Sequence, residues 1–455
     1  MHFLFASCFL VLGSCFLVLL FCILSMKPFH MEQPIPTNTS WSAGRKLLSL
    51  FGMTYLLLYM LPFPLDNIPG LRYIATWYNN GMEYIILFTG HKLLHLSSLT
   101  NTDNGSGDTT FDYVRIVTIL ILAIIIAPVV FIISRKQSNY TAWRQWLIIY
   151  ARYYVGLYMI VYGFIKLFEG QFGSPGIAQL EESYGNASPM GLLWTFMGYS
   201  KPYTVFTGIL ETLAGLLLLF RRTTAIGCLM TMAVMTNVVM LNLFYDVPVK
   251  IFSMHLLFIA FIILWPDLKR LYNFFIRHTA ATLTTSKLIL PKKWMRITRI
   301  IVKGFIIVSL MVGLITEIAG DNDEYAKNTS HGLNGMYKTD LFVFNKDTLQ
   351  AGAGLKRWNK LILDDSYSGI YVGFDSVQYF ELSADTLHKK ITMTSYKDST
   401  EKYRLTYNVL PDNRFVFSGV CRSDSMYAIF KRKQVADYQL INRGFHWITE
   451  APYNR

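Results

Sequence analysis

Charged side chains are scarce in this chain. Only 16% of its 455 residues are Asp, Glu, Lys or Arg, whereas 53% are hydrophobic and the mean hydropathy is positive. Soluble domains carry about 25% charged residues, and apolar runs of about 20 residues, long enough to cross a bilayer, recur here. The composition excludes an ordinary soluble enzyme and predicts a mainly α-helical, multi-pass protein embedded in the lipid bilayer.

Cysteine is also scarce, and no C-x-x-C pair occurs. The C-terminal part of the chain, residues 320–455 (the tail), contains a single cysteine, Cys421, so it cannot form an internal disulfide. Any redox role must therefore use something other than a protein dithiol. For metals, His91 and His95 in "HKLLH" are four apart on an expected helical face, but two ligands without a third at matching spacing are a weak signal. We expect surface histidines and no metal site.

The positive charge is concentrated in the apolar part. Lys and Arg outnumber Asp and Glu by 24 to 13 in residues 1–319 but by only 18 to 16 in residues 320–455. A nucleic-acid-binding protein needs a basic face on a soluble domain, which the near-neutral tail lacks. We therefore expect no nucleic-acid partner.

Seven apolar segments predict membrane-spanning helices. Basic residues collect in alternate connections, which places those connections in the cytoplasm. The tail is then expected on the extracytoplasmic (periplasmic) side of a cytoplasmic (inner) membrane. The predicted spans are 46–62, 113–134, 146–168, 202–220, 223–245, 248–266 and 299–319.

The predicted organisation follows from these spans. The apolar segment at residues 1–30 is an eighth membrane helix, a signal-like segment, or a stretch included because the translation start was assigned too early. The sequence leaves these alternatives open. In the external segment, Asp108 or Thr109 suits the N-cap of the following span. The expected regions are an N-terminal apolar segment (1–30), two helices (44–134) with an external segment (63–112), a four-helix core (146–268), a basic cytoplasmic linker (269–298), a last span (299–319) and an extracytoplasmic domain (320–455).

The tail reads as antiparallel β structure. In "YRLTYNVL", Tyr403, Leu405, Tyr407 and Val409 alternate with polar residues, and similar short runs are separated by Gly, Pro, Asp and Asn. The length suits a closed barrel, lipocalin-like forms included, or a sandwich.

Polar residues recur inside the predicted core. Tyr154, Tyr158, Tyr162 and Lys166 are spaced by four and share one helical face, and Gly156 and Gly163 mark another face that a neighbouring helix can approach closely. Glu211 is the only ionisable residue of the next span, and Asn237 and His255 follow. At about 1.5 Å per residue, these groups lie in the outer half of the predicted bundle.

Three interpretations of these polar groups remain open. In the first, Lys166 extends to the membrane surface, and a protonated Glu211 forms a hydrogen bond with Asn237 or a tyrosine. In the second, Lys166 and Glu211 form a buried ion pair that fixes the register of the two helices. In the third, these groups line a cavity that binds a small amphiphile. The candidate ligand-binding residues are Lys166, Glu211, Asn237, His255, Tyr158 and Tyr162.

Residues 146–266 resemble the DoxX family. The resemblance rests on Arg152, Gly156, Gly163 and Lys166, then Glu211, Gly215, Leu216, Leu218, Leu219 and Arg221. "NGSGDTT" and the closing "RGFHWI" resemble a larger, Bacteroidota-type form with added helices and an external β domain. The resemblance implies a four-helix DoxX-like core. Some relatives are subunits of thiosulfate:quinone oxidoreductases and others belong to oxidative-stress complexes, roles that a shared fold does not transfer.

Two functions are expected on this basis. In the first, the core binds a quinone or similar lipophile as part of an envelope redox system. In the second, the protein is a non-enzymatic scaffold whose β domain recruits an envelope protein. The sequence identifies neither a catalytic residue nor a cofactor, and a quinone is the ligand class that the first function implies.

Overall fold

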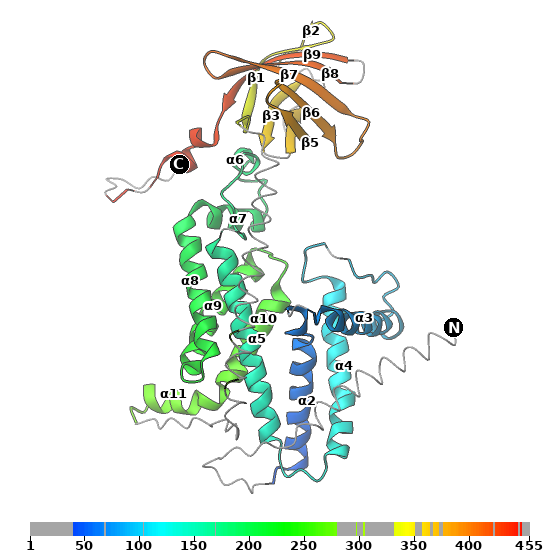
Figure 1. The fold of residues 1–455 in the computed structure, drawn as a ribbon, viewed down its shortest axis with the longest axis vertical. Helices are drawn as coiled ribbons and strands as arrows, with labels where there is room; N and C mark the ends of the chain where they lie inside the picture. Colours follow the sequence, from blue (N-terminus) through cyan, green and yellow to red (C-terminus); the bar gives the residue numbers. More distant parts are fainter. Residues whose placement is uncertain are drawn as a thin grey trace. The chain divides into compact units, whose positions relative to one another are not determined.

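The computed structural model describes two units, one helical and one built on a β barrel (Figure 1). The helical unit contains residues 1–168 and 205–315, and the barrel unit contains residues 169–204 and 316–455. The described residues are 40–67, 70–102, 104–168, 170–279, 297, 304, 332–350, 357–364, 367–372, 376–421, 424–444 and 446–447.

The longer helices follow the predicted apolar segments. They are α2 (Ala43–Met60), α4 (Thr110–Ile133), α5 (Thr141–Leu167), α8 (Lys201–Leu219), α9 (Thr224–Phe244) and α10 (Lys250–Leu264). A short 3₁₀ turn, η3 (Trp265–Asp267), joins α10 to α11 (Leu268–Phe275).

Five helical segments of the described chain are long and apolar enough to cross a membrane: α4, α5, α8, α9 and the continuous stretch Lys250–Phe275. They form a multi-pass membrane protein, as predicted. The segment at 46–62 forms α2, which is not among the five. Arg45 and Lys46 lie in its first turn and reduce its hydropathy. The predicted span 299–319 and the N-terminal segment 1–30 lie outside the described residues.

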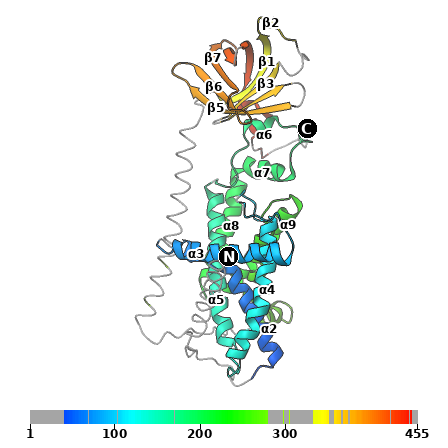
Figure 2. The same ribbon diagram turned by 90° about the vertical axis from the view of Figure 1, so that its right-hand side faces the viewer.

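The external segment contains a helix that the sequence reading did not identify, α3 (Arg72–Phe88), which is extended by the π-helical turn η2 (Thr89–Leu93). Both views show α3 running across the direction of α4 (Figures 1 and 2). The expected His91–His95 pair on one helical face is wrong, because the helix ends before His95, whose φ is 55°. His91 instead donates from Nε2 to the Leu99 carbonyl at 3.0 Å.

Thr109 is the N-cap of α4, one of the two predicted candidates. Its hydroxyl accepts a hydrogen bond from the Asp112 amide, and the Asp112 carboxylate accepts one from the Thr109 amide, a reciprocal capping box. Asp108 has a different role. Its carboxylate accepts hydrogen bonds from the amides of Lys250 and Ile251 at 2.7 and 2.9 Å, so it caps α10 from the loop before α4.

The tail folds as an antiparallel β barrel, which resolves the choice between barrel and sandwich. β1 pairs with β3, each later strand pairs with the one that follows it, and β1 also pairs with β9, which closes the barrel; the short β2 pairs only with β1. The strands are β1 (Gly335–Phe344), β2 (Asp347–Thr348), β3 (Trp358–Asp364), β4 (Tyr367–Val372), β5 (Ser376–Asp385), β6 (Lys390–Ser395), β7 (Lys402–Leu410), β8 (Arg414–Cys421) and β9 (Asp424–Lys433).

Alternating side chains fill the barrel interior. In β7, Leu405 and Tyr407 are buried as predicted, whereas Val409, at the end of the strand, is 58% exposed. Asp412 and Asn413 both have positive φ and belong to the three-residue connection between β7 and β8. The core is rich in aromatic rings that contact one another, including Tyr337, Phe342, Trp358, Phe380, Phe415, Phe417 and Phe430.

The segment between α5 and α8 packs against the barrel. It contains α6 (Ile177–Glu181) and α7 (Pro189–Tyr199). Ile177 lies in a buried cluster with Met336 of β1 and Ile362 of β3, and its amide donates to Asp364 at 3.2 Å. Glu181 accepts hydrogen bonds from Lys360 and Tyr438. Residues 169–204 are therefore part of the barrel unit, although the sequence places them inside the four-helix core.

Candidate functional site

Glycines set the close packing of α5 against α8. A Cβ on Gly163 would lie 2.7 Å from the Gly208 carbonyl oxygen, and one on Gly156 would lie 3.2 Å from that of Gly215. Each helix thus presents two glycines seven residues apart, and the pairs meet in antiparallel order. The close approach predicted from Gly156 and Gly163 is confirmed, and α8 is the partner helix.

This crossing brings Lys166 against Glu211. Their side chains form an ion pair between Nζ and Oε1, and the two residues are only 7% and 3% exposed. The structure therefore brings together two of the predicted site residues, and Lys166 is buried instead of extending to the surface. Burying two charges is costly unless each is fully paired.

One side of this pair is incompletely satisfied. Oε2 of Glu211 is buried and finds no hydrogen-bond donor in the described part of the chain, and the same holds for the adjacent Thr212 hydroxyl. Tyr162 lies within the electrostatic range of the Glu211 carboxylate. A buried carboxylate oxygen in this state has unused capacity to accept a hydrogen bond.

A second polar group is centred on His255 of α10. Its ring stacks on Tyr59 of α2 at 3.9 Å between centroids, and its Nε2 lies 2.6 Å from the Tyr55 hydroxyl. Its Nδ1 must donate to the Ile251 carbonyl at 2.7 Å, because a carbonyl oxygen only accepts. In the neutral ring, Nε2 then accepts from Tyr55.

Aromatic side chains connect the two polar groups. Tyr158 and Tyr162 of α5 both contact the Phe252 ring of α10, at centroid distances of 5.0 and 5.9 Å, and Tyr158 also contacts Tyr154. Phe252 lies one helical turn from His255. Tyr162 lies one helical turn from Lys166 on α5, so ring contacts and helical spacing relate the Lys166–Glu211 pair to the His255 group.

Asn237 does not belong to this set of residues. It is exposed on α9, whereas the residues of α9 that face the protein are Cys228, Thr231, Met235, Val239 and Asn242. The structure does not bring Asn237 together with the other candidate residues, because it lies nearly opposite the buried stripe of α9. Asn242 is the buried amide, and it donates to the Ser253 hydroxyl at 3.0 Å.

Sequence reasoning missed three residues near His255. Tyr55 and Tyr59 are four apart on α2, a spacing that could have identified them. Arg115 of α4 interacts electrostatically with Tyr59, Tyr154, Tyr158 and His255. In the described ranges, no group of three or more His, Cys, Asp or Glu side chains could hold a metal ion.

The comparisons with known proteins give one relative for this chain. No family model matches it, and no solved structure matches it. It is 35% identical over 124 residues to the uncharacterized protein YwoB of Bacillus subtilis (strain 168), a match that covers 27% of this chain and 79% of YwoB. The chain therefore belongs, through this region, to the same family as YwoB.

Proposed function

We propose that the helical unit binds a lipid-soluble molecule with a polar head, of the quinone and quinol class, beside the Lys166–Glu211 pair. The observation that carries this proposal is the buried Glu211 carboxylate, one oxygen of which lacks a donor among the described residues. An ionisable residue held inside a membrane helix is costly and commonly marks a functional site.

The chemistry of the groups suits both forms of the ligand. A quinol hydroxyl can donate to Oε2 of Glu211, whereas a quinone carbonyl can accept from the Lys166 ammonium or a tyrosine hydroxyl. Tyr158, Tyr162 and Phe252 supply aromatic surface for the ring. His255, with its tautomer set by Ile251, is the group among these residues suited to exchange a proton. The role is that of a quinone-binding component in an envelope redox system.

This proposal includes a DoxX-like core and a cytoplasmic-membrane location, with the barrel on the extracytoplasmic side. The distribution of basic residues supports that orientation. So does the packing of α6 on the barrel, because it puts the α5–α8 connection and the barrel on the same side of the membrane.

The test is equilibrium binding of a short-tailed quinone and its quinol to the purified full-length protein. In Glu211→Gln the amide oxygen still accepts from Lys166, but the charged acceptor is lost. A hydrogen bond to a charged group is worth about 1.5–3 kcal/mol, so quinol affinity should fall roughly 10- to 100-fold. Asn237→Ala is the matched control and should bind as the native protein does. Unchanged binding by Glu211→Gln, or an equal loss in Asn237→Ala, would rule the site out.

A non-enzymatic scaffold is the second candidate. The barrel interior is filled by its own side chains, so a partner would bind its outer surface. The barrel is also fixed to the segment that joins α5 to α8. A scaffold requires that the full chain, and not a chain ending at residue 319, retains a specific envelope protein. Equal retention by both forms would argue against this role.

A further inference from the structure

A short amphipathic helix lies at the end of the last described membrane segment. α11 follows Pro266 in η3 and runs across the direction of α8 and α9 (Figure 1). Leu268 and Leu271 pack against the helical core, while no residue of α11 is fully buried. The helix therefore lies along the end of the bundle and has a second, outward face.

Large apolar side chains of this segment remain exposed. Tyr272, Phe274, Phe275 and Ile276 are between 52% and 63% exposed, and Trp265, just before the helix, is 62% exposed. Trp and Tyr are the residue types enriched at the membrane–water boundary. A water-exposed surface of this kind would be unfavourable, whereas a helix lying in the headgroup region would bury it.

The same segment is basic. Lys269, Arg270 and Arg277 lie on or beside α11, and Asp267, the one acid nearby, is already paired with Arg270 at 2.6 Å. Arg277 lies over the Tyr272 ring at 5.6 Å. Lys269 and Arg277 are exposed, so their charges are available to an anionic surface.

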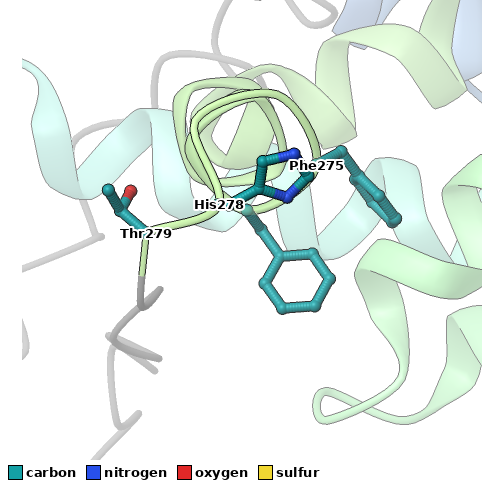
Figure 3. A pocket seen from close by; sticks show the side chains of 4 residues that line it. Phe275, His278 and Thr279 are labelled. Carbon is teal, nitrogen blue, oxygen red and sulfur yellow. The ribbon is translucent and has the colours of Figure 1, made fainter.

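A shallow hollow of about 390 Å³ lies where α11 ends (Figure 3). Phe274, Phe275, His278 and Thr279 line it. It combines two aromatic rings with an imidazole and a hydroxyl, a combination that suits a phosphate group joined to an acyl chain. The Thr279 hydroxyl also donates to the Asn273 carbonyl at 3.3 Å, which holds the chain in this turn.

We propose that α11 and the hollow at its end form a binding site for anionic phospholipid, with the lipid phosphate at His278 and the exposed cations and an acyl chain along Phe274 and Phe275. The site is independent of the Lys166–Glu211 pair. Each Lys or Arg at a membrane surface strengthens attraction to anionic lipid about fivefold.

The test uses the full-length chain in bilayer discs of phosphatidylcholine mixed with phosphatidylglycerol, followed by native mass spectrometry of the lipids retained after mild extraction. The native protein should retain phosphatidylglycerol in preference, and rising salt should weaken this preference. Lys269→Gln with Arg277→Gln should lower the selectivity roughly 25-fold. Arg277→Gln alone, a milder change, should lower it about fivefold.

The matched control removes the same charge from the barrel, by Lys402→Gln with Arg404→Gln, two exposed residues of β7. It should leave the selectivity unchanged. The absence of any native preference for phosphatidylglycerol would overturn the proposal. Equal losses in the α11 and β7 variants would also overturn it, because the effect would then follow net charge alone.

Discussion

Lys166 of α5 and Glu211 of α8 form an ion pair that is almost entirely shielded from solvent. Two adjacent helices meet at this point through glycines, so neither charge can turn away easily. The pair therefore links the packing of the bundle to the chemistry of the proposed site.

Removing one partner of this pair should cost more than removing both. Lys166→Met leaves Glu211 buried without its cation, and a broken buried pair typically costs about 3–5 kcal/mol. Lys166→Met combined with Glu211→Leu replaces both charges with apolar groups and should cost much less than the sum of the single changes. Unfolding of the purified protein in detergent measures the stability of the single and double variants. If the double variant lost as much stability as the two single variants together, the two charges would not interact.

The α5–α8 crossing should not tolerate a methyl group at Gly163. An added Cβ would overlap the Thr212 hydroxyl and lie 2.7 Å from the Gly208 carbonyl oxygen, so Gly163→Ala must push the helices apart. Overpacking of this kind typically costs about 1–3 kcal/mol.

Gly52→Ala in α2 is the matched control for Gly163→Ala. Among the described residues, no heavy atom beyond the adjoining backbone of α2 lies within 4 Å of the added Cβ, so the change should be neutral or stabilising by about 0.5–1 kcal/mol. Equal effects of the two substitutions on detergent unfolding would contradict the packing described here.

The sequence predicted the interhelical contact better than its depth. Gly156 and Gly163 identified a close neighbour because small residues seven apart share a helical face. The depth estimate placed both charges in the outer half of the bundle but did not show that they meet, since it counted each residue from the end of its own span. Because α5 and α8 are antiparallel, Lys166 and Glu211 lie on opposite sides of the Gly163–Gly208 contact along the helix axes. Helical side chains lean toward the N-terminus of their own helix, so these two side chains converge across the contact.

Asn237 shows a different limit. Helical periodicity locates α9, but a helix that is apolar nearly all round does not reveal which face its neighbours cover. The spacing of Thr231, Met235, Val239 and Asn242 defines the buried face only once the bundle is seen. In the tail, local alternation was enough to predict strands, whereas closure through β1 and β9 joins residues about 90 apart and lies beyond any local pattern.

Asp108 should stabilise the start of α10 from a distant loop. Its side chain is 7% exposed and accepts from the amides of Lys250 and Ile251. Asp108→Ala leaves these helix-end donors without their acceptor and should cost about 1–2 kcal/mol in the free energy of unfolding.

Asp246→Asn is the comparison for Asp108→Ala. Asp246 also pairs with Lys250, at 2.8 Å, but its side chain is 82% exposed. Its φ is 53°, a left-handed conformation that Asn tolerates as Asp does, so the change removes the charge without straining the backbone. An exposed pair contributes about 0–1 kcal/mol, so this variant should unfold much as the native protein does. A loss in Asp246→Asn as large as that in Asp108→Ala would assign the effect to the Lys250 charge instead of to the α10 amides.

The attachment of α6 to the barrel should depend on pH through Glu181. Burial alone would raise the pKa of this carboxyl group, but hydrogen bonds from Lys360 and Tyr438 and the charges of Lys360 and Lys433 hold the pKa below its ordinary value of 4.5. A group whose pKa is lowered by folding contributes its full stabilisation above the ordinary pKa, and the contribution is lost as the pH falls through the folded-state pKa. Acid should therefore weaken the attachment, and neutral pH should preserve it.

Amide hydrogen exchange in the α6 segment, corrected for the intrinsic rate at each pH, measures this attachment. Native protection should fall between neutral pH and pH values below 4.5. Glu181→Gln should reduce protection already at neutral pH and flatten the acid dependence, because the amide cannot carry the charge that Lys360 and Lys433 stabilise. Glu182→Gln, at an exposed neighbouring position, should retain the native profile. If Glu181→Gln kept the full acid dependence, a different titrating group would have to hold α6 on the barrel.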